Sequence, residues 1–298
     1  GVSNKQLQII GNYYPTGLSV LSEYSDILAK PEYEDEVSDC LIRLLAKLEF
    51  DELVVPYTTN SSFLYKWCES NKSAFRYIEK IYEGDGTAID VAGDYADYLG
   101  RLGKNTRLKA FNRRVLFSRL GEALLEYADE HSIDEYLSQL NALGKLRWGR
   151  NIFRSQSLDF HRRLAINAYA AGGLKLSRLK LNGEVVSVLY NIKFGAVEYN
   201  IQAAYIEDFH SKLSLGSLHL GYAIASAFDS RTIHVFDLLF GRGKNDAYKN
   251  RYKGQELQFY SFFLGKTFKS LILYQAANLF KRLKKMLKQF FPGANNER

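Results

Sequence analysis

The chain has 298 residues, of which 46% are apolar, and its formal net charge is +7. This composition excludes a disordered chain, and no uncharged apolar run is long enough to predict a membrane-spanning helix. The two cysteines, Cys40 and Cys68, do not predict a disulfide framework, and no signal pattern opens the sequence. We therefore expect a compact protein of the cytoplasm, with a membrane-peripheral position as the alternative.

The first hundred residues alternate between helix and strand patterns. Apolar side chains recur at helical spacing in residues 37–48, and strand-like runs flank them at residues 7–14 and 50–58. Residues 75–91 have the pattern of a strand followed by a glycine turn. A succession of this kind predicts a sheet covered by helices.

Residues 93–120 are strongly basic, with seven Lys and Arg residues and no acid between Asp97 and Glu122. A basic segment beside a binding site attracts the phosphates of an activated donor or an anionic acceptor. The alternative is a solvated helix whose apolar side chains face inward. Two more amphipathic helices are predicted before residue 173.

Residues 173–254 carry the most informative pattern. Asn182-Gly183 lies between two β-rich runs, which predicts a hairpin, and residues 196–206 supply a third strand. Gly216 and Gly221 accompany the start of an apolar helix. A short strand then passes through Asp237 and ends at Gly241, and the pair Tyr248-Lys249 follows, with Arg251-Tyr252 just beyond.

This succession resembles the GNAT acyltransferase superfamily, in particular the double-domain branch of CelD/BcsL-type acetyltransferases, which is related to the FemABX aminoacyltransferases. The Arg147-Trp148 pair matches a motif that such proteins carry upstream. The resemblance implies an α/β (α+β) fold of two GNAT-like domains, with mixed sheets flanked by helices. It implies a GNAT-like half with a basic connecting helix in residues 1–125 and the acyltransferase domain in residues 126–264.

Residues 265–298 form a basic tail. They contain six Lys and two Arg against one Glu, which accounts for the whole net charge of +7. Apolar residues recur there at helical spacing and predict a basic amphipathic helix. Such a helix can lie on an anionic membrane, which would make residues 265–291 a peripheral membrane contact. The alternative is a terminal helix docked on the protein by its apolar face.

The resemblance implies a donor site at the start of the apolar helix that follows the third strand. Glycines there expose main-chain N–H groups, and the positive end of the helix dipole attracts the phosphates of a coenzyme. We expect acetyl-CoA or another acyl-CoA as donor, bound at Leu215, Gly216, Ser217 and Gly221. The alternative for these glycines is a tight turn.

Acyl transfer also needs a base for the nucleophile and an acid for the leaving thiolate. We expect Asp237 to be the base, because it lies near the carboxyl end of a strand, with Glu207, Asp208 and His210 as other candidates. The resemblance implies Tyr252 or Tyr248 as the acid, and Lys249 as a contact to a phosphate or carboxylate. No metal is predicted, because the histidines lack metal-ligand spacing.

We predict an acyltransferase that moves an acyl group to an amine or hydroxyl of a sugar, lipid or polysaccharide precursor of the cell envelope. The acceptor is a small molecule or a glycan. The alternatives are a FemABX-like aminoacyltransferase, in which tRNA is the donor and the only expected nucleic acid, and a catalytically inactive binding module.

Overall fold

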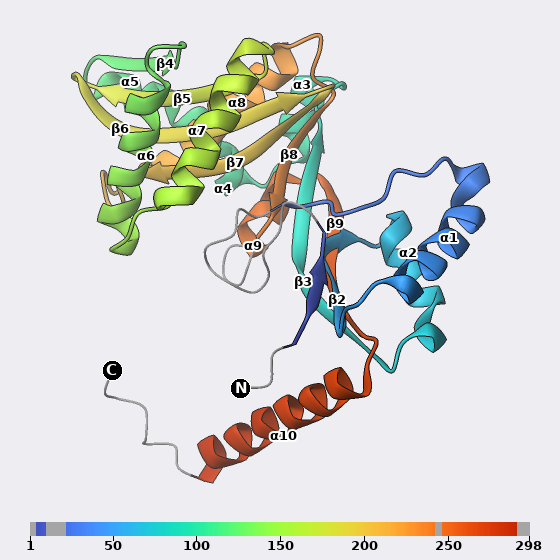
Figure 1. Ribbon diagram of the computed structural model, residues 1–298. Helices are drawn as coiled ribbons and strands as arrows, with labels where there is room; N and C mark the ends of the chain where they lie inside the picture. Colours follow the sequence, from blue (N-terminus) through green and yellow to red (C-terminus); the bar gives the residue numbers. More distant parts are fainter. Residues whose placement is uncertain (1–3, 10–21, 242–245, 291–298) are drawn as a thin grey trace. The chain divides into compact units, whose positions relative to one another are not determined.

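The computed structural model describes residues 4–9, 22–241 and 246–290, and the chain divides into two compact units (Figure 1). Unit 1 consists mainly of Leu21–Glu83 and Phe259–Arg298, and unit 2 of Gly84–Gln258. The strands β3 (Tyr77–Asp90) and β9 (Gln255–Gly265) contribute residues to both units. The predicted mixed α/β class, with sheets flanked by helices, is confirmed.

The sequence analysis divided the chain at residues 125 and 264 into parts that each resemble a GNAT domain. The two compact units are defined by contacts and not by resemblance to GNAT domains. They therefore do not test that division, which stays a prediction. Residues 75–91 differ from the sequence-based expectation, because β3 continues through Gly84 and Gly86 instead of ending in a turn. The strand is held beyond the glycines by its partner β8 (Val235–Phe240), with Gly86 opposite Phe240.

In unit 1, β1 (Gln6–Gln8) runs parallel to β2 (Glu52–Thr59), which is antiparallel to β9. Every residue of β2 is buried. The helices α1 (Glu34–Lys47) and α2 (Phe63–Ser70) supply further core residues, among them Trp67 of α2, which packs in one cluster with Phe262 and Leu264 of β9. The core of unit 1 therefore joins segments from both ends of the chain.

The last described element is α10 (Phe268–Phe290), which follows β9 directly. None of the helices in the described ranges is long and apolar enough to cross a membrane.

In unit 2 the strands are hydrogen-bonded in the order β3, β8, β7, β6, β5, β4. The pair β7–β8 is parallel, and the other pairs with a described register are antiparallel. The bounds not yet given are Val197–Tyr205 for β7, Glu184–Phe194 for β6, Leu174–Leu181 for β5 and Ala123–Tyr127 for β4.

The predicted hairpin is the turn between β5 and β6. Leu181 pairs with Glu184, and both residues of the turn between them have positive φ, +51° at Asn182 and +86° at Gly183. Two central residues with positive φ define the turn type that suits the right-handed twist of the strands, and Asn-Gly tolerates it best. The Asn182 side chain also accepts the N–H of Glu122 at 2.9 Å, which ties the turn to the start of β4.

Helices cover both faces of the sheet of unit 2. On one face lie α6 (Ile133–Trp148) and α7 (Ser155–Ala170), which pack on apolar residues of β5, β6 and β7. The other face is covered by α8 (Leu215–Asp229). Figure 1 shows α6 and α7 lying across the strands.

The basic segment is broken into short pieces that pack against α8. They are α3 (Tyr95–Arg101), α4 (Lys104–Arg107), a π-helical turn at Leu108–Asn112 and α5 (Arg114–Arg119). Arg114 donates to the main-chain oxygen of Gly221 in α8 at 2.7 Å, and its guanidinium lies 4.2 Å from the ring centre of Tyr222. At least this cation has an internal structural role.

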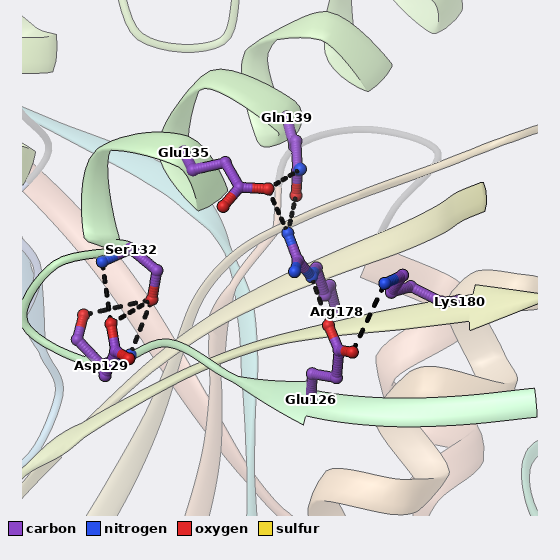
Figure 2. Close-up of polar contacts among 7 residues, drawn as sticks. All are labelled: Glu126, Asp129, Ser132, Glu135, Gln139, Arg178 and Lys180. Atoms are coloured by element: carbon purple, nitrogen blue, oxygen red, sulfur yellow. Dashed lines mark hydrogen bonds and ion pairs between the residues drawn. The ribbon is translucent and has the colours of Figure 1, made fainter. Parts of the chain in front are cut away.

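A polar network fixes α6 to the edge of the same sheet (Figure 2). Arg178 of β5 points between two elements: its Nε donates to Glu126 of β4 at 2.7 Å, and its Nη1 donates to Glu135 of α6 at 2.5 Å. Lys180 completes the network at 3.4 Å from Glu126. Because two cations meet two carboxylates, the charges of the network balance.

Candidate active site

The two parallel strands of unit 2 are paired along only part of their length. Three residue pairs join β7 to β8: Val197 with Val235, Glu198 with Phe236, and Tyr199 with Asp237. Beyond them β7 continues to Tyr205 beside β6, and β8 continues to Phe240 beside β3. The strands therefore part after Asp237, and their facing main-chain edges are not joined to each other in a ladder there.

A β-bulge marks the same position on β7. Tyr190 of β6 pairs with Gln202 and Asn191 pairs with Asn200, so that Ile201 is an extra residue in β7. A bulge re-aims the main-chain groups around it and locally increases the twist of the strand. The sequence analysis did not predict this bulge.

The N-terminus of α8 follows the end of β7. No side chain caps it, and the first N–H that reaches an acceptor is that of Leu218, bound to the oxygen of Ser214 at 2.9 Å. The N–H groups of residues 215–217 have no acceptor within the described part of the chain. Such groups, together with the helix dipole, favour an anion at this end of the helix.

The residues predicted to bind the donor have different surroundings. A Cβ on Gly216 would come within 2.2 Å of the Tyr205 ring, so this glycine allows the end of β7 to pack on the first turn of α8. Ser217 lies in the same turn, and its hydroxyl accepts from Ser214 at 3.1 Å. These two residues are therefore next to the end of β7.

Leu215 and Gly221 are used for packing. The Leu215 side chain is 2% exposed and belongs to the core between α8 and the sheet. A Cβ on Gly221 would lie 2.0 Å from the main-chain oxygen of Ala110, so that glycine permits close contact with the π-helical turn. Their assignment to donor binding stays a prediction.

The two predicted tyrosine acids lie beside the first turn of α8. Tyr252 is 2% exposed and hydrogen-bonds Ser217, while burial raises the pKa of its phenol. The Tyr248 ring is 6.4 Å from the Tyr252 ring and nearly perpendicular to it, and burial raises its pKa too. Both phenols are therefore protonated near neutral pH, as a general acid must be.

Arg147 belongs to the same neighbourhood. Its guanidinium lies 4.3 Å from the ring centre of Tyr205, and its Nε donates to Glu207 at 2.5 Å. Arg147 also acts electrostatically on Tyr248, where it lowers the pKa that burial raises. The sequence motif Arg147-Trp148 thus places a cation beside the end of β7.

Asp237 lies in the middle of β8, and not near its carboxyl end as the sequence analysis expected, because pairing with β3 extends the strand to Phe240. Asp237 is 4% exposed, belongs to the last pair before the strands part, and accepts the N–H of Leu239 at 2.7 Å. The Lys249 Nζ donates to the oxygen of Leu238 at 2.6 Å and to that of Leu239 at 3.0 Å. Lys249 therefore holds the main chain immediately after Asp237.

The other base candidates lie in the loop between β7 and α8. Glu207 is bound to Arg147, and His210 accepts the N–H of Lys212 at 3.0 Å. Asp208 has a positive φ of 52°. In the described part of the chain, no group of three or more His, Cys, Asp or Glu side chains could hold a metal ion.

His219 is a structural residue of the site that sequence reasoning did not use. Its Nε2 lies 2.9 Å from the Ser177 hydroxyl and its Nδ1 lies 2.9 Å from the Ser187 hydroxyl. The side chain is fully buried, and burial lowers its pKa from 6.5 to about 3. His219 thus anchors the start of α8 to β5 and β6 as a neutral ring. Its sequence signal is a histidine in an otherwise apolar helix.

The model of the acetyltransferase (GNAT) domain matches residues 104–253, which is half of the chain. The chain belongs to the GNAT acetyltransferase family. The match contains β7, α8, β8 and the Tyr248–Tyr252 segment, so the parted strands and the uncapped helix lie in the GNAT domain itself. No curated protein sequence matches this GNAT chain.

Solved structures show how far the fold of the GNAT chain extends. FemX matches with a TM-score of 0.56 at 10% identity, over 82% of this chain and 79% of FemX. The C-terminal domain of a putative lysylphosphatidylglycerol synthetase from Agrobacterium fabrum matches with a TM-score of 0.55 at 11% identity, over 86% and 81% of the two chains. The L-PGS of Bacillus licheniformis gives 0.52 at 10% identity, over 80% and 75%. The GNAT chain therefore shares the fold of FemX and of these two proteins over most of its length.

Proposed function

We propose that this GNAT protein moves an acyl group from acyl-CoA to an amine or hydroxyl of a small-molecule or glycan acceptor. The acceptor class we favour is a sugar, lipid or polysaccharide precursor of the cell envelope. The observation that carries the proposal is the parting of β7 and β8 after Asp237, beside the uncapped N-terminus of α8. The family match over the same residues supports it.

Donor binding is assigned to the first turn of α8. The N–H groups of Gly216 and Ser217 and the positive end of the helix dipole would bind the phosphates of the coenzyme. The main-chain groups around the bulge at Ile201 would bind the thioester oxygen, because they lie where β7 leaves β8.

The reaction forms a bond from the nucleophilic nitrogen or oxygen to the acyl carbon and breaks the bond from that carbon to sulfur. Asp237 takes the proton that the nucleophile loses, and Tyr252 or Tyr248 gives a proton to the departing sulfur. Their raised pKa values support the acid role, because a phenol that stays protonated can donate. Lys249 positions the main chain that follows Asp237.

The donor site is tested by a matched pair of variants at Ser217. Gly216 is unsuitable, since any side chain there would collide with Tyr205. Ser217→Asp adds a negative charge at the helix N-terminus, whereas Ser217→Asn changes the side chain without charge. We expect calorimetric titration with acetyl-CoA to show about 10-fold or greater weakening in the Asp variant relative to Asn, as one repelled phosphate contact predicts. Equal affinities of the two variants would contradict this donor site.

Aminoacyl transfer is the second candidate function, and the similarity to FemX and to lysylphosphatidylglycerol synthetases favours it. The same titrations discriminate, because an aminoacyl transferase would bind charged tRNA with a strong salt dependence and would ignore acetyl-CoA. A chain that binds neither donor would be the inactive binding module.

A further inference from the structure

The helix α10 is attached to unit 1 by its polar side. Ser270 is 1% exposed, and the Tyr274 ring stacks on Tyr77 of β3 at 4.2 Å between ring centres. Asp51 accepts from the Thr267 hydroxyl at 2.9 Å and from Lys269 Nζ at 2.7 Å, which fixes the start of the helix. Four large apolar side chains of the helix, Phe268, Ile272, Leu279 and Leu283, are not among these attachments.

Those apolar side chains are exposed. Phe268 is 63% exposed, Ile272 51%, Leu279 58% and Leu283 41%. At about 100° per residue these four positions lie within about 60° of one another, on the side of the helix opposite Ser270 and Tyr274. Phe280, which is 72% exposed, widens the stripe. The docked alternative from the sequence required this face to be covered, and for the described residues it is not.

The charge of the same segment indicates what covers the stripe. Residues 265–298 carry the entire net charge of +7, while the rest of the chain is neutral. A second copy of the helix would bring two such cationic segments together, and like charges oppose that contact. An anionic lipid surface satisfies both properties, because it offers acyl chains to the stripe and negative headgroups to the cations.

We propose that α10 lies flat on an anionic membrane, with Phe268, Ile272, Leu279 and Leu283 inserted at the boundary between headgroups and acyl chains. The helix has 23 residues and is therefore about 35 Å long, and it does not qualify as a membrane-spanning helix. The binding is independent of the acyl-transfer proposal, since it uses no residue of the candidate active site.

The test is flotation of the full chain with vesicles of phosphatidylcholine containing about one-third phosphatidylglycerol, and with vesicles of phosphatidylcholine alone. We expect binding to the anionic vesicles only, reduced at least severalfold by about 0.5 M salt. The variant with Ile272→Gln, Leu279→Gln and Leu283→Gln should bind at least about 10-fold more weakly, because three buried apolar side chains are lost. It should unfold like the parent, since these side chains are exposed.

The matched control replaces three exposed leucines outside α10 by Gln: Leu28, Leu44 and Leu146. The control should float like the parent. Flotation of the α10 variant at the parent's level, or failure of the parent to float, would overturn the proposal. A parent that is dimeric in sedimentation and becomes monomeric in the α10 variant, without flotation of either, would show that the stripe pairs with a second copy instead.

Discussion

The helices α8 and α10 are both rich in apolar residues, but the apolar side chains are buried in α8 and exposed along one face of α10. In α8, Leu218 and Ile224 are completely buried, and the N-terminus has main-chain N–H groups that no side chain caps. In α10, Leu279 and Phe280 are more than half exposed. The comparison shows that an apolar stripe in a helical sequence can be buried in the core or left exposed on the surface. The sequence of the helix does not distinguish these two cases, because burial depends on the elements that pack around it.

Truncation of one leucine in each helix gives the largest expected contrast. Leu218→Ala should lower the free energy of unfolding by about 2–5 kcal/mol, because it leaves a cavity in a closed core. Leu279→Ala, at 58% exposure, should stay within about 0.5 kcal/mol of the parent. Denaturant titration measures both. A large loss from Leu279→Ala would mean that α10 is docked by its apolar face after all.

Measurements of turnover can distinguish the candidate active site at α8 from the exposed surface of α10. Asp237→Asn and Tyr252→Phe should each lower kcat by about 10²-fold or more, because a general base or acid is lost. Donor affinity should change little in either variant. Ile272→Gln on α10 is the control and should leave turnover of a water-soluble acceptor unchanged. If Tyr252→Phe retains full kcat while Tyr248→Phe does not, the acid role passes to Tyr248.

The buried His219 adds a pH dependence that belongs to α8. Its pKa is lowered from 6.5 to about 3 by burial, so between these values the unfolded chain binds a proton that the folded chain does not. The contribution of the neutral His219 to the free energy of unfolding is therefore fully present above about pH 6.5. It falls as the pH drops below that value, by up to about 1.4 kcal/mol per pH unit.

The measurement is the difference between the parent and His219→Gln, which removes the titrating ring. The slope of unfolding free energy between pH 6 and 5 should be steeper in the parent than in the variant. His161, whose pKa burial lowers to about 4, is present in both proteins and cancels in the difference. Parallel slopes would mean that His219 has the same pKa in the folded and the unfolded chain.

Local sequence patterns predicted those elements that are determined by residues close to one another in the sequence. The Asn182-Gly183 hairpin, β8 and the start of α8 all follow from turn and strand signals within a few residues. The continuation of β3 through Gly84 could not be predicted, because β8, its partner, lies far along the chain. The bulge at Ile201 is invisible for the same reason, since it exists only relative to β6.

The candidate site could be predicted as a neighbourhood but not in its details. The order of the motifs predicted that Gly216, Ser217 and Tyr252 belong to one site. In the structure Tyr252 hydrogen-bonds Ser217, which is next to Gly216 in α8. The packing roles of Leu215 and Gly221 depend on Ala110 and the opposite sheet face, which no local pattern encodes. The exposure of the α10 stripe likewise depends on Tyr77 and Asp51, which are far away in sequence.

The division into units also determines the order in which the molecule can be built during translation. Unit 1 takes β2 from the first part of the chain and β9 from the last, and unit 2 lies between them in sequence. On the ribosome, Val55 and Trp67 emerge long before Phe262 and Leu264, the residues that complete their core. Unit 2 can therefore fold while unit 1 is still open, and the segment that carries Val55 and Trp67 becomes stable only after β9 has been made.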